Sequence, residues 1–234
     1  MEAAFVAGAT GYTGREVVGA LRARGVRTAA HVRPDSARLR EWQARLGAMG
    51  AEVDATPWDE AAMSETLRRV RPDVVFALLG TTRRRGTQAS AAGRNETYES
   101  VDYGLTHVLL RAVVASGLRP RFVYLSSMGV REGTRNAYLA ARAKLEKELR
   151  ASGLPFTIAR PSFISGPDRD EPRPLERIAA RATDAALGVV GALGGRGVAD
   201  RWRSTTGTTL AAALVRLAED PGAAGRIVEA EGLR

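Results

Sequence analysis

The chain has 234 residues, of which 44% are apolar, and this is enough for one sizeable core. Charged residues make up 26% and the apolar ones occur along the whole length, which excludes a wholly disordered chain. The absence of cysteine excludes disulfides, thiolate metal sites and cysteine nucleophiles, and leaves only His31 and His107 as candidate nitrogen ligands. We therefore expect a globular protein without a metal site.

The formal charge of +9 raises the question of a nucleic-acid partner, because clustered basic side chains neutralise a phosphate backbone. The basic residues are instead spread through every expected element, and only residues 83–85 form a run of arginines, with no aromatic residues among them. Only Lys144 and Lys147 among the 35 basic residues are lysines, a usage typical of GC-rich coding. The sequence therefore predicts no nucleic-acid partner.

Neither a membrane span nor a signal peptide is expected. The longest nearly uncharged run, residues 185–195, is about half of the ~20 residues that a bilayer span needs, and glycines interrupt it. The amino terminus carries Glu2 where a signal peptide has basic residues, and it soon reaches Gly8. These features predict a cytoplasmic protein with no membrane partner.

Strand-like and helix-like patterns alternate from the amino terminus, which is typical of a parallel sheet with helices on both faces. The segment from Asp73 to Gly80 has a continuous apolar run, as expected of a strand buried on both sides. Strands are expected over residues 3–7, 28–32, 51–53, 73–80, 122–125, 156–159 and 226–230. Helices are expected after Gly14, from about Asp35, after Pro57, over 101–116 and 136–151, and around 210–217. The sequence thus predicts a doubly wound α/β fold.

The regular alternation fails after residue 164. Residues 165–174 contain prolines and alternating charges, and residues 188–197 are rich in glycine, so no regular element is expected there. We interpret the irregular C-terminal segment 165–207 as the cover of a substrate site, within one domain that spans residues 1–234.

Gly8, Gly11 and Gly14 stand between the first expected strand and the first expected helix. Glycine at such a turn lets the backbone approach a diphosphate, and the helix amino terminus supplies free amides and a partial positive charge. The spacing Gly-x-x-Gly-x-x-Gly differs from the Gly-x-Gly-x-x-Gly of two-domain dehydrogenases. A plain tight turn is the alternative, but the position at the start of an alternating chain favours a dinucleotide site.

At the end of the second expected strand, an NAD-binding protein usually has a carboxylate that binds the ribose hydroxyls. This chain has Arg33 there, and a guanidinium can hold a 2′-phosphate through two parallel hydrogen bonds. Arg15, beside the glycine turn, adds a second positive charge, so the pattern favours NADP(H). In the alternative interpretation Asp35 binds the ribose and Arg33 is a surface residue, although Asp35 also suits the amino-terminal cap of the next helix.

A second chemical signal follows the fifth expected strand, at the sheet edge where ligands bind in doubly wound folds. Ser126 and Ser127 end this strand, and Tyr138 and Arg142 lie one helical turn apart on one face of the next helix. A tyrosine hydroxyl titrates near about 10 in water, so a neighbouring cation helps it to donate a proton. The plainer interpretation, in which Tyr138 and Arg142 only form the inner face of a helix, does not explain the serines.

Together these motifs resemble an atypical short-chain dehydrogenase/reductase. The resemblance rests on the glycine turn, Leu-Leu-Gly-Thr-Thr-Arg from residue 78, Ser-Ser-x-Gly from residue 126, Tyr-x-x-x-Arg-x-x-x-Glu from residue 138, and Arg-Pro-Ser from residue 160. It extends from residue 3 to about residue 217, and within the superfamily the chain is most similar to the Tat-interacting-protein-like branch. It implies a Rossmann-type domain with NADPH in its cleft.

The resemblance also implies a role for each matching residue. The diphosphate would be held by Gly8, Thr10, Gly11, Tyr12, Thr13 and Gly14, and the 2′-phosphate by Arg15 and Arg33. Asp54 would face the adenine, Leu79, Gly80 and Thr81 would line the ribose side, and Pro161 and Phe163 would lie by the nicotinamide. Ser127 would polarise a substrate carbonyl, Tyr138 would donate the proton, and Arg142 would complete the catalytic set.

Arg142 departs from the family pattern, which has lysine at this position. Arginine keeps the positive charge but is planar, bulkier and effectively never deprotonated, so it cannot join a proton relay. Two functions remain: an NADPH-dependent reductase of a small carbonyl or quinone-like molecule, and a non-catalytic NADPH-binding sensor that regulates a partner protein. Sugar-nucleotide epimerisation is a third, for which the part after the sixth strand is short. The superfamily is compatible with a monomer or a homodimer.

Overall fold

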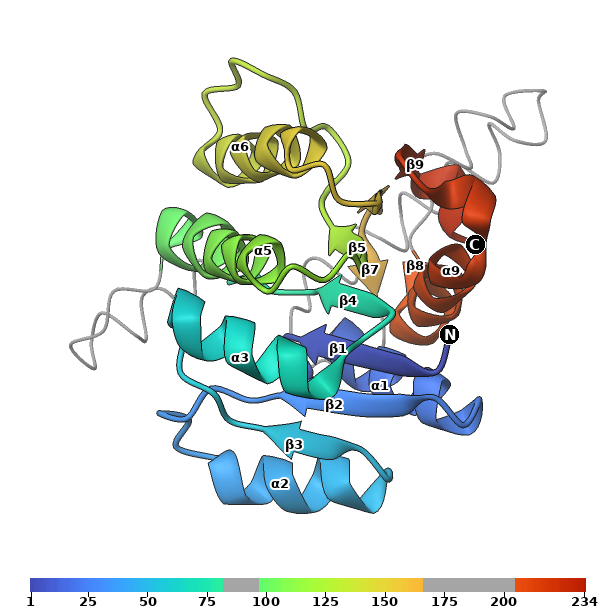
Figure 1. Ribbon diagram of the computed structural model, residues 1–234. Coiled ribbons are helices and arrows are strands. Elements are labelled where there is room, and N and C mark those ends of the chain that lie inside the picture. The colour runs from blue at the N-terminus through green and yellow to red at the C-terminus, as the bar shows by residue number, and fades with distance from the viewer. Residues whose placement is uncertain (82–96, 166–204) are drawn as a thin grey trace.

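The computed structural model describes residues 1–81, 97–165 and 205–234, and its centre is a parallel sheet with helices on both faces (Figure 1). Within these residues the main sheet has seven strands in the order β3-β2-β1-β4-β5-β6-β9, and every neighbouring pair is parallel. The strands are β1 (Ala3–Ala7), β2 (Arg27–His31), β3 (Glu52–Asp54), β4 (Val74–Ala77), β5 (Arg121–Leu125), β6 (Phe156–Arg160) and β9 (Arg226–Glu229). The order reverses between β1 and β4, and ligands of doubly wound folds bind at the carboxyl ends of the strands beside such a reversal.

Each face of the sheet has its own helices and its own core. One face packs against α1 (Tyr12–Ala23), α2 (Leu39–Ala48) and α9 (Gly207–Glu219). The other packs against α3 (Glu60–Val70), α5 (Thr106–Ala115) and α6 (Ala137–Ala151). A π-helical segment, η1 (Tyr98–Leu105), leads into α5, and 3-10 turns η2 (Pro221–Ala223) and η3 (Ala230–Leu233) flank β9. Short strands β7 (Ile164–Ser165) and β8 (Thr205–Thr206) pair in parallel outside the main sheet.

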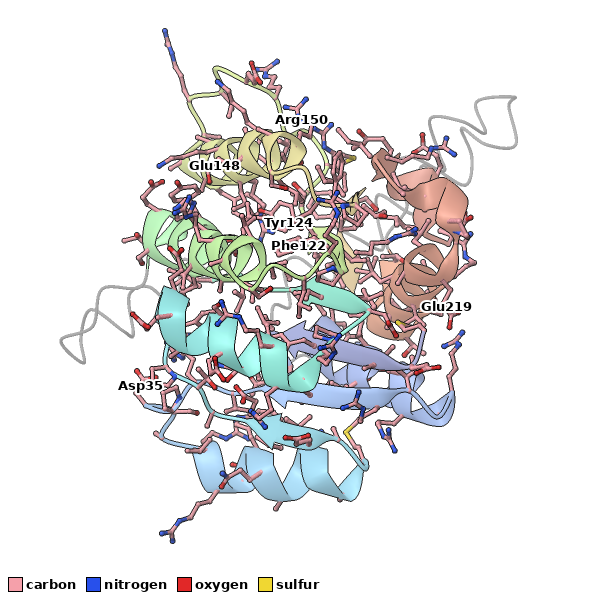
Figure 2. All side chains as sticks on the ribbon, in the orientation of Figure 1. Asp35, Phe122, Tyr124, Glu148, Arg150 and Glu219 are labelled. Atoms are coloured by element: carbon pink, nitrogen blue, oxygen red, sulfur yellow. The ribbon has the colours of Figure 1, made fainter. Side chains whose placement is uncertain are left out.

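The first strand shows how the sequence builds both cores. Successive side chains of a strand point to opposite faces, so Ala4 and Val6 enter the core under α1 while Phe5 and Ala7 enter the core under α3. All residues of β1 are buried. On the second face, Phe122 and Tyr124 of β5 extend the core towards α5 and α6 (Figure 2). The doubly wound α/β fold predicted from the alternation is confirmed, including the last edge strand.

Two local predictions are wrong. The second helix begins at Leu39 and not at Asp35, because the Ser36 amide donates to the Arg33 carbonyl at 3.1 Å and closes a turn over residues 33–36. Asp35 therefore caps no helix; its carboxylate is exposed and lies 3.9 Å from Arg33 Nε. The helix expected from residue 101 starts at Tyr98, as η1, where Thr97 and Ser100 bond reciprocally as a capping box. Its wide first turns carry Asp102, which is buried.

The segment interpreted as a substrate cover lies largely outside the described residues. Of residues 165–207, the structure describes Ser165 in β7, Thr205 and Thr206 in β8, and Gly207, the first residue of α9. The Thr205 amide donates to the Phe163 carbonyl at 2.9 Å, so the chain leaves and re-enters the described part of the fold at the same place. This place is the carboxyl end of β6.

Candidate functional site

The glycine turn joins β1 to α1 at the reversal of strand order. Gly8 has a φ of +87°, and a Cβ at Gly8 would lie 2.6 Å from the Leu78 carbonyl oxygen. A Cβ at Gly14 would overlap the carbonyl oxygen of Gly8, and the Gly11 amide donates to that same oxygen at 2.9 Å. The glycines are therefore required by the packing of the turn itself, between α1 and the end of β4.

The amino terminus of α1 suits an anion. The first amides of a helix have no acceptor within the helix, and Gly11 at the N-cap supplies no side-chain acceptor. No acidic side chain lies in the first turn of this 12-residue helix, so the turn itself carries no negative charge that offsets the positive end of the dipole. Thr10, Tyr12 and Thr13 belong to the same turn, of which Thr13 is buried. The turn has the geometry and the charge that a diphosphate requires.

The start of α9 packs against this turn. A Cβ at Gly207 would lie 2.5 Å from the Tyr12 ring, and the Gly207 amide donates to the Tyr12 hydroxyl at 3.4 Å. One residue further on, the Thr208 hydroxyl donates to Glu16 at 2.9 Å. The carboxyl-terminal part of the chain thus returns to the glycine turn, which sequence reasoning did not foresee.

Arg33 lies two residues after the end of β2 and is half-buried, while Arg15 on α1 is only 8% exposed. The Arg15 guanidinium lies 5.8 Å from the ring centre of Trp42, a residue of α2 that Arg38 and Arg45 also approach, at 5.0 and 5.4 Å. The loop before α2 and its first turn line a hollow of about 500 Å³. The β2 end of the site is therefore rich in guanidinium groups.

Asp54, at the end of β3, is buried and its carboxylate is fully engaged within the protein. One oxygen accepts from the Thr56 amide at 3.0 Å, and the other accepts from the Thr56 hydroxyl at 3.1 Å and from Arg69 at 3.0 Å. These contacts fix the turn after β3. The prediction that Asp54 faces an adenine has no further observation to support it.

The turn after β4 contains Leu79, Gly80 and Thr81, and Asp102 of η1 holds it. The Thr81 amide donates to Asp102 Oδ2 at 2.9 Å. A Cβ at Gly80 would lie 2.9 Å from Arg142 Nη2 and 3.3 Å from Asp102 Oδ1, so glycine is needed for this close approach. The three residues predicted to line a ribose are thus in contact with the buried pair of Asp102 and Arg142.

Arg142 of α6 is the other half of this pair. Its Nη2 lies 2.7 Å from Asp102 Oδ1 and 3.3 Å from the Leu79 carbonyl, and its Nη1 donates to the Leu125 carbonyl at the end of β5. Burial raises the pKa of Asp102, and Arg142 opposes that rise. Burial also raises the pKa of Tyr124 to about 12, beside the same guanidinium. The guanidinium joins the ends of β4 and β5 to η1.

Tyr138 lies one turn before Arg142 on α6, as predicted, and is half-buried. The Arg142 guanidinium lies 5.1 Å from the centre of its ring, and Tyr98 packs edge-on against it with ring centres 5.2 Å apart. Ser127, after the end of β5, is also half-buried and donates a long hydrogen bond of 3.4 Å to the Met128 carbonyl. In the described part of the chain no hydrogen bond joins the Ser127 and Tyr138 hydroxyls.

Glu146, one turn beyond Arg142, forms a second buried charge cluster. It accepts from the Ser126 hydroxyl at 2.5 Å and pairs with Arg160 at 2.6 Å, and Arg160 also contacts Glu229 of β9 at 3.0 Å. This cluster fastens the end of β5 to the end of β6. Pro161 and Phe163 follow β6; Pro161 is buried, whereas Phe163 is 60% exposed at the edge where β7 begins.

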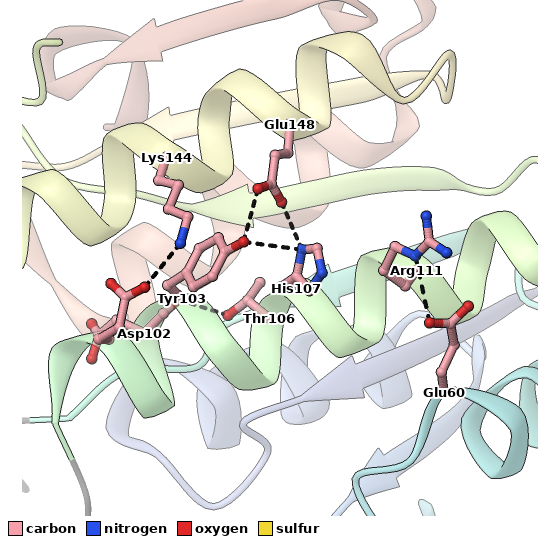
Figure 3. A network of polar contacts seen from close by, with 9 residues as sticks. Glu60, Asp102, Tyr103, Thr106, His107, Arg111, Lys144 and Glu148 are labelled. Carbon is pink, nitrogen blue, oxygen red and sulfur yellow. Dashed lines mark hydrogen bonds and ion pairs between the residues drawn. The ribbon is translucent and has the colours of Figure 1, made fainter.

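Sequence reasoning missed Asp102 and Glu146 as supports of the site. The signal for Glu146 was present, because the spacing Tyr-x-x-x-Arg-x-x-x-Glu puts three polar residues on the inner face of one helix, and buried charges need partners. His107 of α5 is half-exposed, and its Nδ1 lies 2.6 Å from Glu148, which also accepts from Tyr103 at 2.8 Å (Figure 3). His31 is buried in the sheet.

Residues 1–81, 97–165 and 205–234 contain no group of three or more His, Asp or Glu side chains arranged to hold a metal ion. None of the helices in these ranges combines the length and the apolar character that a bilayer crossing requires.

A protein-family model described as NAD(P)H-binding matches residues 8–188, which is well over half of the chain. The chain belongs to this NAD(P)H-binding family. The resemblance to the atypical short-chain dehydrogenases/reductases is confirmed with it, and NAD(P)H binding is the coarse function that the family description gives.

Among curated proteins, the chain is 33% identical over 116 residues to "Protein FMP52, mitochondrial" of Debaryomyces hansenii, covering 49% of this chain and 47% of that protein. It is 35% identical over 109 residues to "Protein fmp52-1, mitochondrial" of Aspergillus terreus, covering 46% and 44%. The chain spans about half the length of these curated relatives. Their names contradict the cytoplasmic location expected from the amino terminus, because several relatives are named mitochondrial proteins.

Solved structures agree on the fold. A putative NAD-dependent epimerase/dehydratase from Bacillus halodurans has a TM-score of 0.68 at 18% identity, covering 99% of this chain and 97% of that chain. An oxidoreductase of the short-chain dehydrogenase/reductase family from Burkholderia thailandensis has a TM-score of 0.68 at 22% identity, covering 99% and 92%. At these identities the likeness establishes a Rossmann-type architecture and nothing finer.

Proposed function

We propose that the chain is an NADPH-dependent reductase that transfers hydride to a small carbonyl or quinone-like substrate. The observation that carries the proposal is the placement of Tyr138 and Ser127 at the carboxyl edge of the sheet, the same edge that carries a glycine turn suited to a diphosphate. Both side chains are partly exposed, so each is accessible to a ligand at this edge.

Three parts of the chain fit the cofactor. The uncapped start of α1 would hold the diphosphate, the turn from Leu79 to Thr81 would lie along the nicotinamide ribose, and Phe163 would offer its exposed ring near the nicotinamide. When bound, the cofactor supplies the hydride. The Ser127 hydroxyl donates a hydrogen bond to the substrate oxygen, and the Tyr138 hydroxyl gives that oxygen its proton. Arg142 supplies a cation beside the Tyr138 ring but is itself held by Asp102.

NADPH is preferred to NADH in this proposal because a guanidinium, and not a carboxylate, follows the end of β2. Arg33→Ala should lower the preference for NADPH over NADH by about tenfold, the loss of one charge-assisted contact to a phosphate. Fluorescence titration with both coenzymes measures this ratio. Arg24→Ala, an exposed arginine at the end of α1, is the matched control and should leave the ratio unchanged. Equal affinities of the parent for the two coenzymes would remove the argument from Arg33.

Tyr138→Phe tests the catalytic assignment. NADPH oxidation with a panel of quinones and small aldehydes should fall by about 100-fold or more, because the substrate oxygen loses its proton donor. Tyr98→Phe is the control, since it also removes a phenolic hydroxyl, but from the neighbouring ring that packs against Tyr138. Oxidation that survives in Tyr138→Phe would place the chemistry elsewhere.

A second candidate is a cofactor-loaded sensor that regulates a partner protein without catalysis. One observation favours it: the Arg142 guanidinium is engaged by Asp102 and by two backbone carbonyls, where the family pattern has a compact lysine. Tight NADPH binding by the parent together with no oxidation across the whole panel would support the sensor over the reductase.

A further inference from the structure

The buried pair of Asp102 and Arg142 contacts three consecutive residues after β4. Arg142 Nη2 donates to the Leu79 carbonyl at 3.3 Å, the pair lies against the Cα of Gly80, and Asp102 accepts from the Thr81 amide at 2.9 Å. Asp102 is fully buried, so both of its carboxylate oxygens are committed inside the protein. Contacts of this kind fix the path of a turn more than they stabilise one side chain.

The Leu79–Thr81 turn is also close to the glycine turn. Gly8 approaches the Leu78 carbonyl and the Leu79 amide so closely that an added Cβ would lie 2.6 and 3.2 Å away from them. A shift of the turn after β4 would therefore change the space beside the diphosphate turn. The pair also reaches the end of β5, where Arg142 donates to the Leu125 carbonyl, two residues before Ser127.

We propose that Asp102 is a positioning residue for the nicotinamide half of the cofactor. Through Arg142 and the Thr81 amide, it holds the Leu79–Thr81 turn where the ribose attached to the nicotinamide passes. Arg142 acts as the second member of this support, because the hydrogen bonds of its Nη1 and Nη2 atoms go to protein acceptors. The adenosine half lies on the β2 side of the glycine turn and does not depend on the pair.

Two unpartnered atoms support this assignment. Thr81 Oγ1 and Arg142 Nε are buried and have no hydrogen-bond partner among the described residues. Buried polar atoms without partners are rare in folded proteins, and they are found where a ligand or an ordered water completes the site. Thr81 belongs to the turn that the pair holds, and Arg142 belongs to the pair itself.

The proposal rests on binding of a nicotinamide dinucleotide and does not require turnover. Calorimetric titration of Asp102→Asn with NADPH, NADH and 2′,5′-ADP tests it, at a temperature below the melting transition of the variant. The affinity for the preferred coenzyme should fall by about tenfold. The affinity for 2′,5′-ADP, which lacks the nicotinamide half, should stay within about twofold of the parent.

Glu148→Gln is the matched control, because it makes the same carboxylate-to-amide change at a half-exposed position of α6 that contacts His107 and Tyr103, and it should alter neither affinity. Arg142→Lys is the second test variant, used if Asp102→Asn does not fold, since one ammonium group cannot reach three acceptors at once. A parallel loss of coenzyme and 2′,5′-ADP would show a general structural role and overturn the proposal, and so would unchanged coenzyme affinity. A reductase assay without activity would leave this result intact.

Discussion

The two halves of the site are built by different means. The half at the glycine turn consists of main chain: Gly8 and Gly14 allow backbone to pack on backbone, and the helix start has no side-chain cap. The half at α6 consists of buried charges: Arg142 with Asp102, and Glu146 with Arg160, join the ends of β4, β5 and β6. A substitution in the first half should therefore destabilise the protein through steric overlap. A substitution in the second half should destabilise it by leaving a buried charge without its partner.

Arg142→Gln should give the largest effect in this comparison. It leaves the Asp102 carboxylate buried without its cation, which costs about 4 kcal/mol of unfolding free energy near neutral pH. Burial already raises the pKa of Asp102 above its ordinary value of 3.8, and removing the guanidinium raises it further. The folded state then binds a proton more tightly than the unfolded state does, so stability is lost as the pH rises from 3.8 through the raised folded value.

Urea unfolding of parent and variant at about pH 5 and about pH 8 measures this dependence. The difference between the two proteins should be larger at the higher pH. A constant difference would mean that Asp102 is not the group left uncompensated.

Gly14→Ala should have the second largest effect and lower the unfolding free energy by about 3 kcal/mol. The new Cβ overlaps the Gly8 carbonyl, so the backbone must move. Coenzyme binding should be lost with it. Gly47→Ala is the matched control, since nothing lies within 4 Å of a Cβ there and α2 gains a better helix former. Thermal melting that shows equal effects of the two substitutions would contradict the packing described for the turn.

Glu146→Gln and Glu148→Gln compare a buried with a half-exposed ion pair on one helix. Glu146 is 1% exposed and accepts hydrogen bonds from Ser126 and Arg160, so Glu146→Gln should lower the unfolding free energy by about 2 kcal/mol. Glu148 is partly solvated beside His107, so its loss should cost less than about 1 kcal/mol. Urea unfolding curves of the two variants give the difference directly; a reversed order would refute the role given to Glu146.

The glycine-turn half was predictable because its signal is contiguous. Gly8, Gly11 and Gly14 lie within seven residues, directly after a buried strand, and local sequence carries both the turn and the helix start. The same holds for Tyr138 and Arg142, whose spacing fixes their common helix face. The doubly wound order of strands followed from the alternation of elements along the chain.

The α6 half was only partly predictable, because its partners are distant in sequence. Asp102 and Arg142 are 40 residues apart, and Glu146 and Ser126 are 20 apart. The pattern indicates that a charge inside a helix face needs a partner, but it does not say which acid supplies it. The π-helical turns that carry Asp102 inward also leave no periodic signature, since the apolar residues after it still fit an α-helix.

The start of α1 is proposed to bind the diphosphate of a nicotinamide dinucleotide, and calorimetric titration of the folded parent chain with NADPH, repeated with excess ADP-ribose, tests this binding. We expect a saturable heat of binding that ADP-ribose suppresses, because both molecules present the same diphosphate to the turn. A chain that releases no heat and gains no melting temperature with either NADPH or NADH would contradict it.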